Sequence, residues 1–358
     1  MEASGKQGGA ATGGQDIQLG FVENAEAWKL ISRFFPTKVG GKPAWLDLKN
    51  LPPPEMMKCF HCDAPYAFLC QIYAPIEEKD SCFHRTIFLF ICKNPACSQE
   101  DEGGIVALRC QLPLDNEFYP DTPFEERPVV GKDEYGAEHY MNICAVCGCL
   151  GSKQCAGCKK VHYCGKAHQT IDWKMGHKQN CKEVGRPGDG SSKFLLPEAD
   201  VVIEEEPADA KKREKTDEEK MADYATLVKD KIESLPDADV GELDKMASSG
   251  GDDPVFTRFR KRVAREPEQV VRYWRGGAPL WVSSRRVPAA ADVPACRCGA
   301  ARQFEFQVLP QLLNHLDLDE TGDSVDWGTL AVYTCSDSCQ PPAGEPAYAA
   351  EVVWKQQL

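Results

Sequence analysis

The amino-acid sequence predicts an α+β protein whose larger part is an internally duplicated, mostly-β domain with ribbon-like zinc sites. A cross-braced zinc finger and an acidic linker interrupt this domain. Three observations support the prediction: the phrase GGKPAWL at 40–46 returns as GGAPLWV at 276–282, a cysteine pair and two strand-like segments follow each copy, and a stretch dense in Cys and His separates the copies. Because the same order of features occurs twice, we expect an internal repeat.

Composition favours a metal-binding protein of a reducing compartment. The chain has 358 residues, 18 cysteines and a formal net charge of −13. Residues 1–16 are small, polar and glycine-rich, without the apolar core of a signal peptide, so we expect a disordered leader and a location in the cytoplasm and nucleus. Thiols stay reduced there, which favours metal ligation over disulfides. The negative charge argues against direct nucleic-acid binding, and the short apolar runs argue against a membrane protein.

The first repeat half, residues 17–130, alternates apolar and polar segments, which is typical of short strands. The second half, residues 254–358, repeats its order: AFLCQIYAP and IFLFICKNPAC in the first half correspond to FEFQVLPQ and LAVYTCSDSC in the second. In each half, two knuckles at the ends of neighbouring strands would supply four thiolates to a ribbon zinc site. The predicted ligands are Cys59, Cys62, Cys92 and Cys97 in the first half, and Cys296, Cys298, Cys335 and Cys339 in the second.

An alternative for these eight residues is a set of reduced cysteines that pack as small hydrophobic side chains. The pair Cys296-x-Cys298 is one residue tighter than the usual zinc knuckle, which keeps this alternative open. Four thiolates near one point repel one another unless they bind a metal, which favours zinc.

Residues 140–184 form the predicted zinc finger. Two residues between thiolates let both sulfurs reach one ion, and residues four apart share one face of a helical turn. In a cross-braced arrangement the first and third ligand pairs bind one ion, and the second and fourth pairs bind the other. The predicted ligands are Cys144, Cys147, Cys164 and His168 for the first Zn²⁺, and Cys155, Cys158, His177 and Cys181 for the second. Both sites are closed, so we expect a structural role.

The predicted acidic linker, residues 185–253, opens with GRPGDGSS and carries few apolar side chains. Between Glu198 and Asp253 there are 19 acidic and 8 basic residues, which indicates a solvated, flexible segment. Beyond it the chain turns basic, and Phe256, Phe259 and Val263 share one face of a predicted helix. Its basic side chains form either an RNA-contacting patch or a face that docks on the acidic linker, and the short run favours the second interpretation.

Each repeated phrase contains a glycine pair, a proline and a tryptophan. Gly40-Gly41 and Gly276-Gly277 permit positive φ angles or close backbone approach, while Trp45 and Trp281 offer large side chains to bury. Such turns either fix the start of a strand or build a ligand-contacting loop. The structural role is the simpler expectation.

The finger resembles the MYND zinc-finger family. The matching residues are Tyr163, Cys164, Gln169, Trp173, His177 and Cys181. The resemblance implies an interaction module, often one that takes proline-containing peptides near the Gln169 and Trp173 positions. The alternative for Trp173 is that it packs the small core of the finger.

From about Leu19 to Gln356 the chain resembles the programmed cell death protein 2 family. The resemblance rests on LGFVENAEAW, FPTKVGGKPAWL, the finger, FLLPEADVVIEEE, EPEQVVRYWRGGAPLWVS, QFEFQVLPQLLNHL, DWGTLAVYTCSDSC and EVVWKQ, in that order. It implies a dedicated chaperone that captures a newly made small-subunit ribosomal protein of the universal S-five family and escorts it during ribosome biogenesis. An acidic scaffold suits such a basic client. We expect the client to lie between the two repeat halves, with the linker steering it.

Two other functions compete with this expectation. Some MYND-containing proteins are lysine methyltransferases, but the chain has neither a cofactor-binding glycine motif nor a Ser/His/Asp arrangement, so we expect no enzyme. The alternative is a nuclear transcriptional co-regulator that recruits partners through its MYND finger. The repeat halves make up the larger part of the chain, whereas a recruiter needs only the finger and a tether, and this favours the chaperone.

Overall fold

The computed structural model describes residues 17–100, 104–128, 135–183, 185–207, 253–316, 325–342 and 344–357. The expected leader, residues 1–16, and residues 208–252 of the expected acidic linker lie outside this part of the chain.

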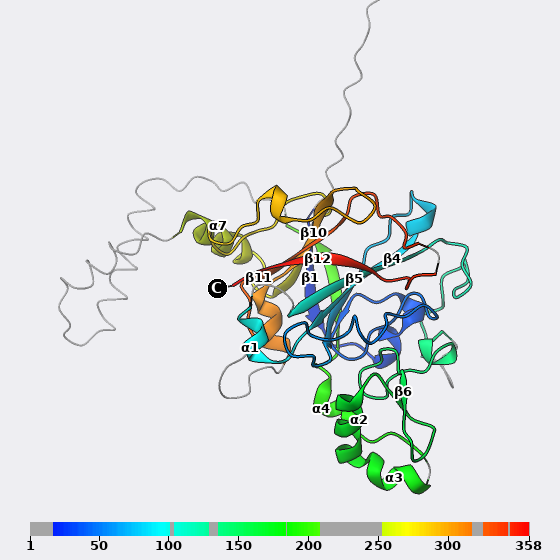
Figure 1. The fold of residues 1–358 in the computed structure, drawn as a ribbon. Coiled ribbons are helices and arrows are strands. Elements are labelled where there is room, and N and C mark those ends of the chain that lie inside the picture. Colours follow the sequence, from blue (N-terminus) through cyan, green and yellow to red (C-terminus); the bar gives the residue numbers. More distant parts are fainter. Residues whose placement is uncertain are drawn as a thin grey trace, which may run out of the picture.

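Ten antiparallel-paired strands form one closed barrel, which confirms the mostly-β prediction (Figure 1). Around the barrel the order is β1-β8-β2-β3-β4-β5-β12-β11-β10-β9, and β9 pairs with β1 to close it. A separate two-stranded sheet, β6-β7, belongs to the finger. The strands are β1 (Gln18–Glu23), β2 (Lys38–Val39), β3 (Ala67–Tyr73), β4 (His84–Ile91), β5 (Ile105–Leu112), β6 (Lys153–Gln154), β7 (His162–Tyr163), β8 (Ala199–Glu205), β9 (Gln269–Tyr273), β10 (Arg302–Val308), β11 (Thr329–Cys335) and β12 (Ala349–Gln356).

The helical segments are short, and most belong to the finger or to loops around the barrel (Figure 1). The predicted basic helix is present as α7, with Phe259 and Val263 buried on its inner face. The helices are α1 (Pro95–Ser98), α2 (Lys166–Asp172), α3 (Lys178–Glu183), α4 (Gly190–Phe194) and α7 (Pro254–Val263). The tighter or wider turns are η1 (Ala27–Leu30), η2 (Ser32–Phe34), η3 (Asp80–Cys82), η4 (Ala137–His139), η5 (Trp173–His177), η6 (Ala290–Asp292) and η7 (Pro310–His315).

The two predicted halves share one barrel, and neither half forms a sheet of its own. Strands β3–β5 come from the first half and β9–β12 from the second. One seam joins β5 to β12, where Arg109 lies opposite Ala349, and the other joins β1 to β9, where Gln18 lies opposite Tyr273. Closing the barrel pairs the backbone groups that an open sheet would leave at its edges, which explains why the halves merge.

Strand β8 corrects the start of the predicted linker at residue 185. It lies between β1 and β2 and completes the barrel wall on that side. Ala199 and Val201 are buried, Asp200 is half-buried, and Glu204 and Glu205 at the end of the strand are exposed. The excess of Asp and Glu across 198–253 predicts a solvated segment, whereas the apolar side chains at alternate positions, Ala199, Val201 and Ile203, fit a strand.

The repeated phrase makes the same contact with the barrel in both copies. Gln71 in β3 accepts a hydrogen bond from the backbone N–H of Ala44 at 2.9 Å and donates to its carbonyl oxygen at 3.3 Å. Gln307 in β10 accepts from the N–H of Leu280 at 2.6 Å and donates to its carbonyl oxygen at 2.9 Å. Gly40 has a φ of +60°, and a Cβ there would lie 1.8 Å from a backbone carbonyl oxygen. Each copy of the phrase thus forms a loop that is hydrogen-bonded to a glutamine of a neighbouring barrel strand.

The finger projects from one end of the barrel and is attached through the first copy of the phrase (Figure 1). The indole N–H of Trp45 donates to the carbonyl oxygen of Gly148 at 2.8 Å. The ammonium of Lys42 donates to the carbonyl oxygen of Ala145 at 2.9 Å, and the Ser191 hydroxyl donates to the same oxygen at 3.0 Å. These bonds tie the first turn of the finger to the GGKPAWL loop and to α4.

Candidate metal centres

The structure brings together all four predicted ligand sets. Within each set the candidate ligand atoms lie within 4.8 Å of one another. Such sets of sulfur and imidazole nitrogen are typical of structural zinc sites. The four sets are Cys59, Cys62, Cys92 and Cys97; Cys144, Cys147, Cys164 and His168; Cys155, Cys158, His177 and Cys181; and Cys296, Cys298, Cys335 and Cys339.

The first finger set forms where the loop before α2 meets the first turn of the finger. His168 lies one helical turn after Cys164, and its Nδ1 is 3.1 Å from the Cys164 sulfur and 3.5 Å from the Cys144 sulfur. The imidazole is buried, so its ring cannot turn its Nδ1 outward to water. One imidazole nitrogen and three sulfurs therefore converge, as a tetrahedral zinc site requires.

In the second finger set, a hydrogen bond fixes which imidazole nitrogen can bind a metal. Nδ1 of His177 lies 2.6 Å from the carbonyl oxygen of Arg186, so Nδ1 carries the proton that this acceptor needs. Nε2 keeps its lone pair and faces the Cys155 sulfur at 3.3 Å and the Cys158 sulfur at 3.8 Å. Zinc-binding histidines are commonly oriented by this kind of bond, so the donor set fits zinc.

The set in the first half joins a turn after the GGKPAWL loop to the end of β4. The turn is closed by a hydrogen bond from the N–H of Cys59 to the carbonyl oxygen of Ala64, and Asp63 has a φ of +56°. Cys62 and Cys92 bring their sulfurs to 3.6 Å. The positive φ of Asp63 lets the chain turn tightly between Cys59 and Ala64, as in the knuckle of a zinc ribbon.

The set in the second half is closed despite its tighter Cys-x-Cys knuckle. The N–H of Cys296 donates to the carbonyl oxygen of Ala300, and Gly299 has a φ of +90°, which turns the chain within fewer residues. The sulfurs of Cys296 and Cys339 lie 3.5 Å apart, and those of Cys298 and Cys335 lie 3.6 Å apart. The shorter spacing does not prevent the four sulfurs from meeting.

The thiols of the first-half set compete for negative charge. Burial alone would raise the pKa of the Cys62 thiol, but hydrogen bonds from the backbone N–H of Ala64 and from Cys92 and Cys97 lower it to about 7. Burial and the neighbouring thiols Cys62 and Cys59 raise the pKa of Cys97 to about 11. A divalent cation would stabilise the thiolate form of all four residues at once, which is the charge state that zinc requires.

Each ribbon set is bound by side chains of the opposite half. The chain after Cys97 presents carbonyl oxygens to β12: Lys355 donates to those of Ser98 and Glu100, and Gln357 donates to that of Gln99 at 2.8 Å. These contacts connect the first-half knuckle to the last strand of the barrel.

The second-half knuckle is bound in the same manner by the first half. The Arg109 guanidinium donates to the carbonyl oxygen of Cys339 at 3.0 Å, and the Gln111 amide donates to that of Ser338 at 3.1 Å. The thiol of Cys82 donates to Gln111 at 3.4 Å. The cysteine spacing predicted the ligands, but no local pattern pointed to these partners, which lie more than 200 residues from the knuckle they hold.

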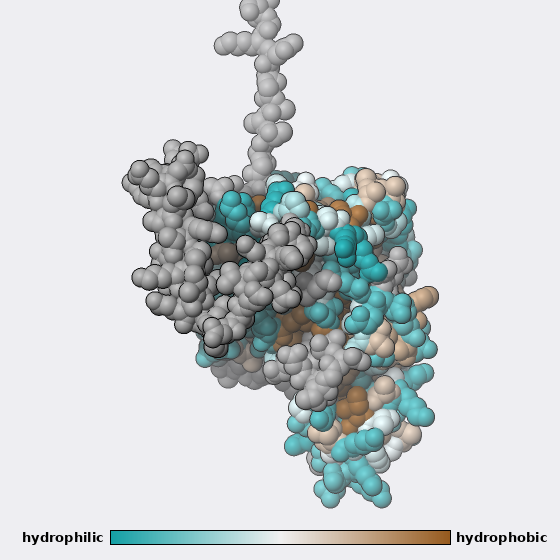
Figure 2. Space-filling view, turned by 90° about the vertical axis from the view of Figure 1, so that its left-hand side faces the viewer, coloured by the Kyte–Doolittle hydropathy of each residue, from teal (hydrophilic) through white to brown (hydrophobic). Residues whose placement is uncertain are grey.

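The two predicted partner-binding residues lie on the finger. Trp173 is 39% exposed, and its ring contacts the His177 ring edge-on at a centroid distance of 5.7 Å, while Gln169 is partly buried. Trp173 therefore both packs on a ligand residue and offers a face to solvent. On the face shown in Figure 2, the finger carries an apolar patch surrounded by hydrophilic side chains.

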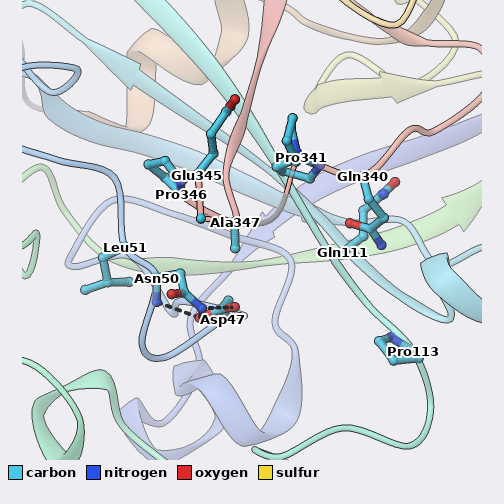
Figure 3. Close-up of a pocket in the computed structure, with 12 residues that line it drawn as sticks. Asp47, Asn50, Leu51, Gln111, Pro113, Gln340, Pro341, Glu345, Pro346 and Ala347 are labelled. Carbon is cyan, nitrogen blue, oxygen red and sulfur yellow. Dashed lines mark hydrogen bonds between the residues drawn. The ribbon is translucent and has the colours of Figure 1, made fainter.

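A cavity of about 560 Å³ lies between the two halves of the barrel (Figure 3). Its walls are Asp47, Asn50 and Leu51, the end of β5 at Gln111 with Pro113 beyond it, and residues 340–342 and 344–347. Sequence reasoning missed it because its walls come from segments far apart in the chain. Two proline-rich stretches were the only local signal.

None of the helices in the described part of the chain has the length and apolar character needed to span a bilayer.

Comparison with known proteins gives matches along most of the chain. Residues 16–126 match the model described as programmed cell death protein 2, N-terminal domain; residues 144–181 match the MYND finger; and residues 253–357 match programmed cell death protein 2, C-terminal putative domain. Programmed cell death protein 2 of Mus musculus is 43% identical over 358 residues, covering 98% of each chain. Programmed cell death protein 2-like of Homo sapiens is 27% identical, covering 86% of each.

A more distant relative has a name that refers to ribosomal RNA. The Probable 20S rRNA accumulation protein 4 of Schizosaccharomyces pombe is 23% identical over 374 residues, covering 89% of this chain and 92% of that protein. No solved structure matches the chain.

Proposed function

The chain belongs to the programmed cell death protein 2 family, and from this premise we propose that it acts in ribosome biogenesis as an escort chaperone of a small-subunit ribosomal protein. The observation that carries the proposal is the near full-length likeness to a protein named for the accumulation of 20S rRNA. The client is a newly made member of the universal S-five family, as the resemblance of the sequence implies.

Charge supports a client of this kind. The chain has a formal net charge of −13, and ribosomal proteins that bind RNA are basic. Opposite charge accelerates encounter and stabilises a partner that would otherwise bind RNA prematurely. The acidic segment to residue 253 adds to this field and steers the client.

In this account the metal centres have a structural role. The donor sets suit four zinc ions, two in the finger and one in each half, and every set is complete without a water ligand. The matching Gln71 and Gln307 contacts and the paired knuckles support an origin by internal duplication. We propose no catalytic step for this protein, and we place its action in the cytoplasm and nucleus.

A test of the proposal is coexpression of the small-subunit ribosomal protein with and without this chain. We expect the ribosomal protein to be mostly insoluble alone and to become soluble in a stoichiometric complex. An unrelated protein of equal size and net charge is the control. If that control raises solubility equally, or if the client stays insoluble with this chain, the chaperone proposal is wrong.

A recruiting role in the nucleus is the second candidate, favoured by the 39% exposure of Trp173 on the MYND finger. In that role, a proline-containing peptide of a transcriptional co-regulator would bind near Gln169 and Trp173. Trp173→Ala separates the candidates: recruitment requires loss of partner binding in this variant, whereas the chaperone proposal expects client capture to persist.

A further inference from the structure

We propose that the cavity lined by residues 47, 50 and 51 on one side and by residues 340–342 and 344–347 on the other binds a cationic side chain of a basic partner protein. The inference rests on the proposed function for the identity of the partner, but the chemistry of the partner follows from the cavity itself. Figure 3 shows Asp47 and Asn50 on one side of the space and Gln111 and Gln340 on the other. Both halves of the barrel therefore contribute to one site.

Each amide side chain around the cavity uses its nitrogen in at least one hydrogen bond to another protein group. The Asn50 amide nitrogen donates to the carboxylate of Asp47 at 3.1 Å, and the Gln340 amide nitrogen donates to the carbonyl oxygen of Ser81 at 2.6 Å. The Gln111 amide nitrogen donates to the second-half knuckle. Each amide also carries a carbonyl oxygen that can accept hydrogen bonds, and among the described contacts the side-chain oxygens of Asn50 and Gln340 have no donor. A ligand that supplies several N–H donors complements them.

The negative charge of the cavity lining favours a cationic ligand. Two carboxylates, those of Asp47 and Glu345, line the cavity, and none of its described lining residues is Lys or Arg. Asp47 is 5% exposed, and its carboxylate accepts from the backbone N–H groups of Lys49 and Asn50 at 2.9 and 2.7 Å. A guanidinium or ammonium group would add an attraction that an anion or a neutral group lacks.

The walls are held in place before a partner arrives. The hydroxyl of Tyr348 donates to the carbonyl oxygen of Asp47 at 2.8 Å, and the N–H of Ala347 donates to that of Asn50 at 3.1 Å. Gln340 directly follows a ligand residue of the second-half set, which anchors this end of the loop. A site with fixed walls loses less entropy on binding than a mobile loop.

Glu345 already has a surface partner, Arg297, which follows the first cysteine of the same set. Both side chains are about half exposed, at 50% and 43%. Exposed ion pairs of this kind contribute little free energy. Glu345 can therefore exchange Arg297 for an incoming cation at small cost.

Gln340→Arg tests the site by placing this chain's own guanidinium in the cavity. The control is Gln99→Arg, which adds the same charge beside the first-half knuckle, two residues after Cys97. The probe is a fluorescently labelled hexa-arginine peptide, and binding to the full-length zinc-loaded chain is followed by anisotropy at physiological salt. Zinc content and melting temperature show that each variant is folded.

We expect Gln340→Arg to weaken peptide binding at least tenfold, and Gln99→Arg to change it less than twofold. Equal weakening by both variants would mean that the peptide senses only the overall charge, and the site would be refuted. The site is also refuted if the peptide binds only after deletion of residues 208–252, because the basic run 211–215 of this chain would then be the occupant. A change in the oligomeric state of Gln340→Arg without a change in peptide binding would refute it as well.

Capture of the ribosomal protein separates this inference from the proposed function. If wild-type chain and Gln340→Arg capture the client equally, the cavity inference fails and the chaperone proposal stands. If hexa-arginine binds as expected but no ribosomal protein is captured, the cavity is a cation site and the chaperone proposal fails.

Discussion

Arg85 in β4 and Glu305 in β10 form an ion pair with both side chains fully buried, although the residues are 220 positions apart. Their second contact, from the other guanidinium nitrogen, measures 2.6 Å. The Glu305 carboxylate also accepts from the hydroxyl of Tyr273 at 3.0 Å and from that of Thr334. The pair links the first half of the sequence to the second across the barrel. Each half therefore neutralises a buried charge of the other.

Breaking this pair from one side should destabilise the whole barrel. Arg85→Met leaves a buried carboxylate without its cation, and we expect the free energy of unfolding to fall by roughly 3–5 kcal/mol. The measurement is urea unfolding of the zinc-loaded protein. The control is Glu125→Gln, which removes one partner of the exposed pair with Arg127 and should leave unfolding unchanged. Comparable effects of the two substitutions would contradict our account of the buried pair.

The same pair predicts a response to acid. Burial alone would raise the pKa of Glu305, but the Arg85 guanidinium and the Thr334 hydroxyl hold it below its ordinary value. The stabilisation is therefore complete above the unfolded-state pKa, near 4.3 for Glu, and is lost as the pH falls through the lower folded-state pKa. The wild-type free energy of unfolding should fall more steeply between pH 5 and pH 3 than that of Glu305→Gln, by up to about 1.4 kcal/mol per pH unit. Parallel curves would show that Glu305 does not titrate with unfolding.

The metal centres predict how many zinc ions each chain binds. Inductively coupled plasma mass spectrometry should find about four zinc ions per chain if every complete donor set binds zinc. Cys59→Ser and Cys296→Ser should each remove one ion and lower the melting temperature, because each knuckle is also bound by the opposite half. Cys82→Ala, at a buried thiol outside the four sets, should keep the full count. A wild-type count of two would restrict zinc to the finger.

The topology predicts that the chain survives a cut in its acidic segment. A protease site inserted between residues 208 and 252 would separate β8 from β9 in the chain, yet β1 pairs with both of them, and β5 pairs with β12. We expect the two fragments to elute together in native buffer and to separate only in denaturant. Fragments that separate in native buffer would show that the halves are independent domains.

The sequence was most informative where structure depends on residues close together in the chain. The spacing of Cys164 and His168 places both on one helical turn, and the knuckle Cys59-x2-Cys62 turns locally, so both ligand sets could be predicted. The basic helix was also predictable, because the spacing of Phe259 and Val263 indicates one buried face.

Features that depend on distant residues could not be predicted. The partnership of Arg85 with Glu305 depends on barrel closure, which no local pattern encodes. Strand β8 was hidden because acidic residues dominate its surroundings, although its inward positions are apolar. The cavity and the strand pairings β5–β12 and β1–β9 could not be predicted for the same reason. Asp47 and Gln340 line one cavity only after the two halves have joined.

The most direct test of the chaperone account is purification of the tagged chain from cells at moderate salt, followed by quantitative mass spectrometry of proteins retained near stoichiometric level. The account predicts one small-subunit ribosomal protein of the universal S-five family, recovered without the rest of the subunit. Recovery of chromatin or transcription factors in its place, with no ribosomal protein, would contradict the chaperone account and favour recruitment through the MYND finger.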